Sequence, residues 1–250
     1  MIPIFKSHYS IGKSILTLNP AGNKDSSQSD SIFDILIDNK IDTLVLVDDS
    51  PTGFLQARKY CSEYNINFIF GLRLPFLCEQ DEDSLHKNIV FSKSSNGCKI
   101  LNEIYSQSFS IESKHCSYEI LKGLWSKDDL MLAVPFYDSF LYQNTFSFSN
   151  CVPDFSFCDP VFMIENNNLP TDNLMIPVIE KYCSDFNYST LSCQTILYKN
   201  TGDVEALQTY KCICNRNFGK SRTLDKPNFH NFGSNEFSFE SFLSKSKSKY

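Results

Sequence analysis

DTLVLVDDSPTGFLQARKYCSEYNINFIFG, residues 42–71, contains a complete strand–helix–strand pattern. The apolar run from Leu44 to Val47 is typical of a strand that is buried on both faces. A polar loop, 48–53, separates it from the helical segment 54–65, and a second apolar strand is expected to end at Gly71. Two such strands joined through a helix indicate a parallel β-α-β unit.

The same alternation continues along the chain on both sides of this unit. Further strands are expected at 87–92, 130–136, 160–165 and 189–198. Helices are expected at 32–39, 95–109, 117–124, 171–187 and 203–215, the first of them capped by Asp30 or Ser31. About seven such units favour an α/β barrel over an open sheet. We expect one domain, 1–243, followed by a flexible basic tail, 244–250.

Composition and charge exclude several classes of protein. The formal net charge of −6 argues against a chain whose main role is to bind nucleic acid, because phosphate contacts require a surplus of Lys and Arg. The ten cysteines are scattered and give no zinc-finger spacing. The N-terminus does not resemble a signal peptide, and no apolar run is long enough for a membrane helix. We therefore expect a cytoplasmic protein with reduced thiols, in the host cytoplasm if it is viral.

The segment SHYSIGKSIL, 7–16, suggests a phosphate-binding loop through Gly12, Lys13 and Ser14. A Walker loop also requires a glycine five residues before Gly12, because its tight backbone must point several N–H groups at phosphate oxygens. Ser7 occupies that position. The nucleotide-hydrolase interpretation is therefore disfavoured.

Five segments resemble, in the same order, motifs of the PHP (polymerase and histidinol phosphatase) domain at the N-terminus of the bacterial DNA polymerase III α subunit. The first contains the family's Ser-x-Tyr-Ser element, and the others correspond to its strand–helix units and its late Leu-x-Cys-Ile helix. The resemblance spans roughly residues 3–243, nearly the whole chain. The segments are FKSHYSIGKSIL (5–16), LVLVDDSPTGFLQARKYC (44–61), INFIFGLRLPF (66–76), KNIVFSKSSNGCKILNEIYSQSF (87–109) and STLSCQTILYKNTGDVEALQTYKCICN (189–215).

The resemblance implies a distorted (β/α)7 barrel of the PHP type with metal ions at the carboxyl ends of its strands. In that family, His and carboxylate side chains hold two or three divalent ions, which activate a water molecule for attack on phosphorus. Here the family's His-x-His positions hold Ile4 and Lys6, or Lys6 and His8 if one gap is allowed. The family's Asp is kept as Asp48, but the His after it is Asp49.

The remaining ligand positions are also replaced. The family's Glu is Arg73, and the residue before Ile89 is Lys87 or Asn88. The late Asp-x-His pair is replaced by Thr195 and Leu197, and the following helix His by Leu207. The resemblance therefore implies a degenerate metal site.

The replacements place positive charge where the family binds cations. We expect Lys6, Arg73 and Lys87 to neutralise the remaining carboxylates, and the three are candidates for binding phosphate. His8, Asp48 and Asp49 are weak metal-ligand candidates. The alternatives are a polar strand end for His8 and helix N-terminal acids for the two aspartates.

The resemblance implies a stand-alone PHP-like domain that acts as a non-catalytic scaffold or accessory subunit of a DNA replication complex, as in a bacteriophage or a reduced genome. No cofactor is expected, and Mn²⁺, Zn²⁺ or Mg²⁺ would be bound only if a residual site works. The expected partner is a replication protein, with weak or indirect nucleic-acid contact and no membrane. One alternative is a metal-dependent phosphoesterase or 3′–5′ exonuclease with a reduced metal set. A second is a phosphate- or nucleotide-binding module.

Overall fold

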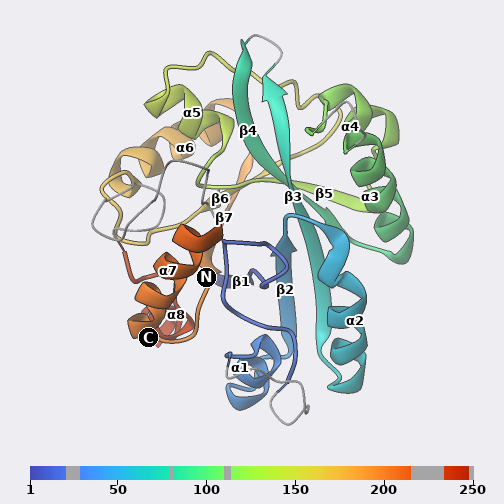
Figure 1. Ribbon diagram of the computed structural model, residues 1–250. Coiled ribbons are helices and arrows are strands. Elements are labelled where there is room, and N and C mark those ends of the chain that lie inside the picture. Colours follow the sequence, from blue (N-terminus) through green and yellow to red (C-terminus); the bar gives the residue numbers. More distant parts are fainter. Residues whose placement is uncertain (21–28, 79–80, 110–113, 215–233, 248–250) are drawn as a thin grey trace.

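The strand–helix–strand unit of residues 42–71 is part of a closed seven-strand barrel with helices outside it (Figure 1). This computed structural model describes residues 1–20, 29–78, 81–109, 114–214 and 234–247. Neighbouring strands pair in chain order, and the first strand pairs with the last. The strands are β1 (Ile2–Phe5), β2 (Thr43–Asp48), β3 (Asn67–Cys78), β4 (Asp81–Ser92), β5 (Leu130–Val134), β6 (Val161–Ile164) and β7 (Ser189–Ile196).

The helices pack against the outside of the barrel, and most of them were expected from the sequence. Ser31 caps the first helix by accepting hydrogen bonds from the backbone N–H groups of Phe33 and Asp34, as predicted. The helices are α1 (Ile32–Asp38), α2 (Phe54–Glu63), α3 (Ser95–Ser108), α4 (Tyr118–Leu124), α5 (Phe140–Phe146), α6 (Asp172–Phe186), α7 (Val204–Cys214) and α8 (Phe239–Lys247).

Two of these helices correct the sequence-based assignment. α5 lies within 137–170, where the Pro and Asn residues of the sequence predict a loop-rich segment. Burial of Phe140 and Leu141 in the core, together with the Ser139 cap, stabilises a helix there. α8 continues to Lys247, so the expected flexible tail from residue 244 is helical as far as the structure describes it.

β4 runs antiparallel to both of its neighbours, which corrects the expected all-parallel arrangement. Only residues 79–80 separate it from β3, and a parallel pair needs a crossover of about a dozen residues or more. The two strands therefore form a long hairpin in which Arg73 pairs with Ile89 and Pro75 with Lys87. Figure 1 shows this hairpin extending beyond the other strands.

The barrel interior is filled by apolar side chains from nearly every strand. Gly71 lies inside β3 rather than at its end, and a Cβ atom there would come within 2.7 Å of the Phe91 ring. The glycine thus makes room for an aromatic ring of β4 inside the barrel. The buried interior residues are Ile4, Val47, Ile89, Phe91, Ala133, Met163 and Cys193.

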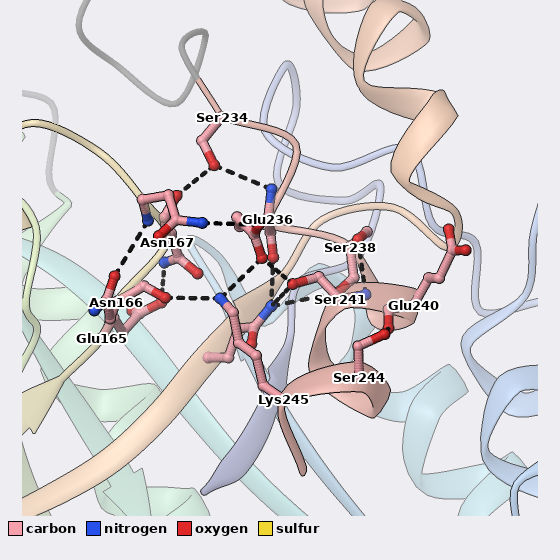
Figure 2. A network of polar contacts seen from close by, with 12 residues as sticks. Glu165, Asn166, Asn167, Ser234, Glu236, Ser238, Glu240, Ser241, Ser244 and Lys245 are labelled. Carbon is pink, nitrogen blue, oxygen red and sulfur yellow. Dashed lines mark hydrogen bonds and ion pairs between the residues drawn. The ribbon is translucent and has the colours of Figure 1, made fainter. Parts of the chain in front are cut away.

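The C-terminal helix is held against the barrel by a network of polar contacts (Figure 2). Lys245 pairs with Glu236 at 3.0 Å and donates to the backbone carbonyl of Asn166 at 2.7 Å. Glu236 also accepts hydrogen bonds from Ser241 and from the side chain of Asn168. These contacts fix α8 next to the loop that follows β6.

Candidate functional site

The carboxyl ends of the parallel strands present a group of polar side chains continuous with the barrel interior. Successive side chains of a strand point to opposite faces, so residues two positions beyond an interior apolar residue also face inward. By this alternation the apolar interior gives way to charged and polar residues, which we call the polar rim. The polar rim consists of Lys6, Asp49, Arg73, Lys87, Glu165 and Thr195.

Lys6 and Asp49 form the centre of the polar rim. The Lys6 Nζ atom lies 3.1 Å from Asp49 Oδ1, and the exposed fractions of the two side chains are 4% and 26%. Lys13 Nζ contacts the other carboxylate oxygen of Asp49 at 2.7 Å. Burial raises the pKa of Asp49, but Lys6 and Lys13 outweigh it and hold the pKa well below its ordinary value. Asp49 is therefore an anion shared between two lysines.

Burial lowers the pKa of Lys6, an effect that the charge of Asp49 opposes. An ammonium group with so little exposure requires a nearby anion, because an unpaired charge in such a position is strongly disfavoured. The ion pair thus makes the burial of Lys6 possible.

Arg73 makes a second ion pair on the polar rim. Its Nη2 atom lies 3.0 Å from Asp138 Oδ2 and 2.9 Å from the carbonyl oxygen of Tyr137. Asp138 follows β5 and has a positive φ of 59°, a conformation that Asp tolerates better than most residues. The Nε atom of Arg73 is buried and has no hydrogen-bond partner. Arg73 is thus held in place with part of its guanidinium unused.

Lys87 belongs to the polar rim but makes no ion pair with any residue that the structure describes. Its backbone N–H donates to the carbonyl oxygen of Asp138 at 2.7 Å, which fixes the strand beside the β5 loop. Burial lowers the pKa of its side chain to about 8, and the nearby charges of Lys13 and Arg73 add to this effect.

Glu165 and Thr195 complete the polar rim through neutral contacts. Glu165 is buried and accepts hydrogen bonds from the backbone N–H and the hydroxyl of Thr195, each at 2.8 Å. The side chain of Asn167 donates a further hydrogen bond to it at 3.0 Å. Burial raises the pKa of Glu165 despite these donors. Glu165 is therefore held by hydrogen bonds from Thr195 and Asn167.

Asp48 lies on the opposite face of β2, away from the barrel interior. Its carboxylate accepts hydrogen bonds from the backbone N–H of Ser7 at 2.9 Å, from the Ser7 hydroxyl at 2.6 Å and from the Ser10 hydroxyl at 2.7 Å. Burial raises its pKa, and Lys6 and the serine donors counteract that effect. Asp48 therefore anchors the loop after β1. The sequence-based expectation that the basic residues neutralise both aspartates is met by ion pairs at Asp49 but not at Asp48.

The other sequence candidates lie outside the polar rim. His8 stacks on Tyr9 with ring centroids 4.3 Å apart, and its buried Nδ1 atom has no hydrogen-bond partner. Gly12 and Lys13 lie in a turn that leads into no helix, and Ser14 donates to the carbonyl oxygen of Leu197. The structure thus gives the Gly-Lys-Ser sequence no phosphate-loop geometry.

The residues of the polar rim do not fit the metal cluster that the family resemblance implies. Three positions carry cationic side chains, and the carboxylates nearest to them are occupied by Lys6, Lys13 and Arg73. In the described part of the chain, no group of three or more His, Cys, Asp or Glu side chains is arranged to hold a metal ion. A divalent ion at the rim would also be repelled by these cations.

Sequence reasoning missed several residues of this site. Glu165 could have been found by alternation, because it lies two positions after the interior residue Met163. Lys13 and Asp138 could not, because each meets its partner from a loop. Lys211 on α7 is also close to Lys13 and Asp138, and burial and Lys13 together lower its pKa to about 8.

No family model matches the sequence, and no curated protein matches it. Within the described residues, no helix combines the length and the apolar character needed to cross a bilayer.

Proposed function

We propose that this chain is a PHP-like barrel that acts as a non-catalytic scaffold or accessory module in a DNA replication complex. A closed seven-strand barrel with helices outside it supports the proposal, and the antiparallel β4 is a departure from the (β/α)7 architecture of that family. The ordered segments that resemble the polymerase III α subunit supply the link to replication. That link is an analogy of sequence, since a fold alone does not specify a function.

One observation carries the non-catalytic part of the proposal, namely the ion pair between Lys6 and Asp49. In the family, the position of Lys6 holds a metal-binding His. Here its ammonium group instead provides a fixed positive charge, and the lone pairs of Asp49 are used by Lys6 and Lys13. The carboxylate that could hold a water-activating metal ion is thus already used in ion pairs within the rim.

The phosphoesterase alternative requires a metal ion held by the remaining candidates. Asp48 and Asp49 point to opposite faces of β2, so their carboxylates are poorly placed to share an ion. Hydrolysis of a phosphodiester in the presence of Mn²⁺ that is lost in Asp48→Ala and retained in Ser7→Ala would favour this alternative. We expect no such activity.

The partner is tested by affinity capture of the tagged chain from its native cell, with mild cross-linking and mass spectrometry. We expect a polymerase subunit among the cross-linked proteins, joined to lysines on the barrel exterior such as Lys99. Capture in which no replication protein is cross-linked would overturn the scaffold assignment. A tagged chain denatured before mixing provides the control for non-specific adhesion.

A further inference from the structure

The polar rim carries more positive than negative charge. Five basic side chains act on one another electrostatically at the carboxyl end of the barrel. Among the described ion pairs, Asp49 binds Lys6 and Lys13, and Asp138 binds Arg73. Glu165 is a third carboxylate on the rim, and Arg73 acts on it electrostatically. The five basic residues are Lys6, Lys13, Arg73, Lys87 and Lys211.

Two basic side chains on the rim have N–H groups that make no hydrogen bond or ion pair in the described part of the chain. The buried Nε–H of Arg73 has no acceptor, and the Lys87 ammonium has no ion pair among the described residues. A guanidinium N–H without an acceptor therefore lies in the same group of charges as an ammonium that makes no ion pair and is only acted on at a distance by Asp49 and Asp138. Lys13 and Lys87 are partly exposed, so an external ligand has a route to them.

From these observations we propose that the polar rim binds a phosphate group, with Arg73, Lys87 and Lys13 as its ligands. A tetrahedral dianion supplies acceptor oxygens in several directions, which matches a guanidinium N–H and two ammonium groups arriving from different strands and loops. Asp49 holds Lys13 and Asp138 holds Arg73, so these two carboxylates compete with the ligand for two of its cations. The inference rests on the non-catalytic rim of the proposed function but is independent of any polymerase partner.

The probes are inorganic phosphate and a nucleoside monophosphate, with the unphosphorylated nucleoside as a negative control. Binding is measured by isothermal titration calorimetry on the full chain in a chloride buffer. We expect saturable binding of the phosphorylated probes and none of the nucleoside. A nucleoside monophosphate that binds more tightly than free phosphate identifies a nucleotide as the natural ligand, and equal affinities identify the phosphate group alone.

Three variants test the assignment of residues. Lys87→Met is expected to weaken phosphate binding by about tenfold, the effect of losing one charge-assisted contact. Lys99→Met, on the exposed surface of α3, removes the same charge and is expected to change nothing. Asp138→Asn keeps the loop conformation but frees Arg73 from its ion pair, so binding is expected to tighten. A gain of affinity in this variant cannot result from a damaged fold.

The pH dependence is followed with sulfate, because its charge stays constant across the range. The titratable and charged groups that act on Lys87 are Lys13, Arg73, Asp49 and Asp138, and the pKa of Lys87 itself is about 8, as is that of Lys211. Sulfate affinity is therefore expected to fall as the pH rises through about 8, and to fall less steeply in Lys87→Met.

Absence of phosphate binding, or equal losses in Lys87→Met and Lys99→Met, would overturn the phosphate-site proposal. Neither result would affect the scaffold proposal, which depends on capture of a replication protein. Failure of that capture would in turn leave the calorimetric result intact.

Discussion

The Lys6 ammonium and the Asp49 carboxylate, 3.1 Å apart, occupy the carboxyl ends of β1 and β2 and face the same barrel interior. In the family that the sequence resembles, this part of the barrel binds divalent cations. Here a cation of the chain itself is buried beside the carboxylate. This internal ion pair underlies the predictions that follow.

The two members of this pair are expected to differ in their importance for stability. Asp49→Ala leaves Lys6 buried without a counter-ion and should lower the free energy of unfolding by about 3 kcal/mol. Lys6→Met replaces the charge with an apolar chain of similar length, and Asp49 keeps Lys13, so the loss should be below about 1 kcal/mol. Urea denaturation measures both. Equal losses would mean that Lys6 does not depend on Asp49.

Asp48 is expected to matter for stability alone. Asp48→Asn retains the shape of the side chain but turns an NH₂ group toward donors of Ser7 and Ser10, so it should cost about 2 kcal/mol. Ser10→Ala, which removes one of the donors, should cost about 1 kcal/mol. Thermal or urea unfolding distinguishes the two. An Asp48→Asn protein as stable as the wild type would contradict the anchoring role.

Lys87 makes stability depend on pH in a defined direction. Its pKa is about 8 in the folded chain, against an ordinary value of 10.5. Between these two pKa values the unfolded chain binds more protons than the folded chain, so the contribution of Lys87 to the free energy of unfolding rises with pH. Below about pH 8 the full cost of burying the charged ammonium is present. Lys87→Met removes that penalty and should be more stable than the wild type at neutral pH.

The stability difference between Lys87→Met and the wild type should shrink as the pH is raised from about 7 to about 9.5. Comparing the two proteins at each pH cancels the titration of the buried cysteines and tyrosines. The measurement is made in a buffer without phosphate or sulfate, because a bound anion would stabilise the wild type. A difference that stays constant or grows with pH would show that Lys87 is not desolvated.

Gly71 tests the packing of the barrel interior. Gly71→Ala places a methyl group within 2.7 Å of Phe91 and should destabilise the fold by about 2 kcal/mol. Phe91→Leu in the same chain should recover part of that loss, because it relieves the clash. Gly123→Ala in α4 is the matched control, since no atom lies within 4 Å of its added Cβ. If Gly71→Ala is as mild as Gly123→Ala, the ring does not fill the interior at this position.

The order of strands and most helices follow from local sequence patterns, but the direction of β4 does not. Residues 81–86 are largely polar and lie outside the strand predicted at 87–92, whereas long-range pairing with β3 extends β4 back to Asp81. The pattern at Gly71 also suggested a strand end, since glycine is unfavourable within a strand. The reason for a glycine at this position becomes apparent only from its close approach to Phe91 of the neighbouring strand.

The polar rim was only partly predictable for a similar reason. Lys6, Arg73 and Lys87 follow strand positions, and alternation fixes which way they face. Their partners do not share that regularity, because Lys13 and Asp138 belong to loops whose conformation depends on tertiary contacts. Sequence spacing therefore identified where the cations lie but not which carboxylates hold them.

The account is tested most directly by equilibrium dialysis of the purified chain against micromolar Mn²⁺ or Zn²⁺, followed by elemental analysis. Because Lys6 and Arg73 place positive charge on the polar rim and Asp49 is already paired, we predict less than one ion bound per chain. Lys6→His should not restore a cluster by itself, since Arg73 remains. Two or three ions bound per wild-type chain, lost in Asp49→Ala, would contradict the account.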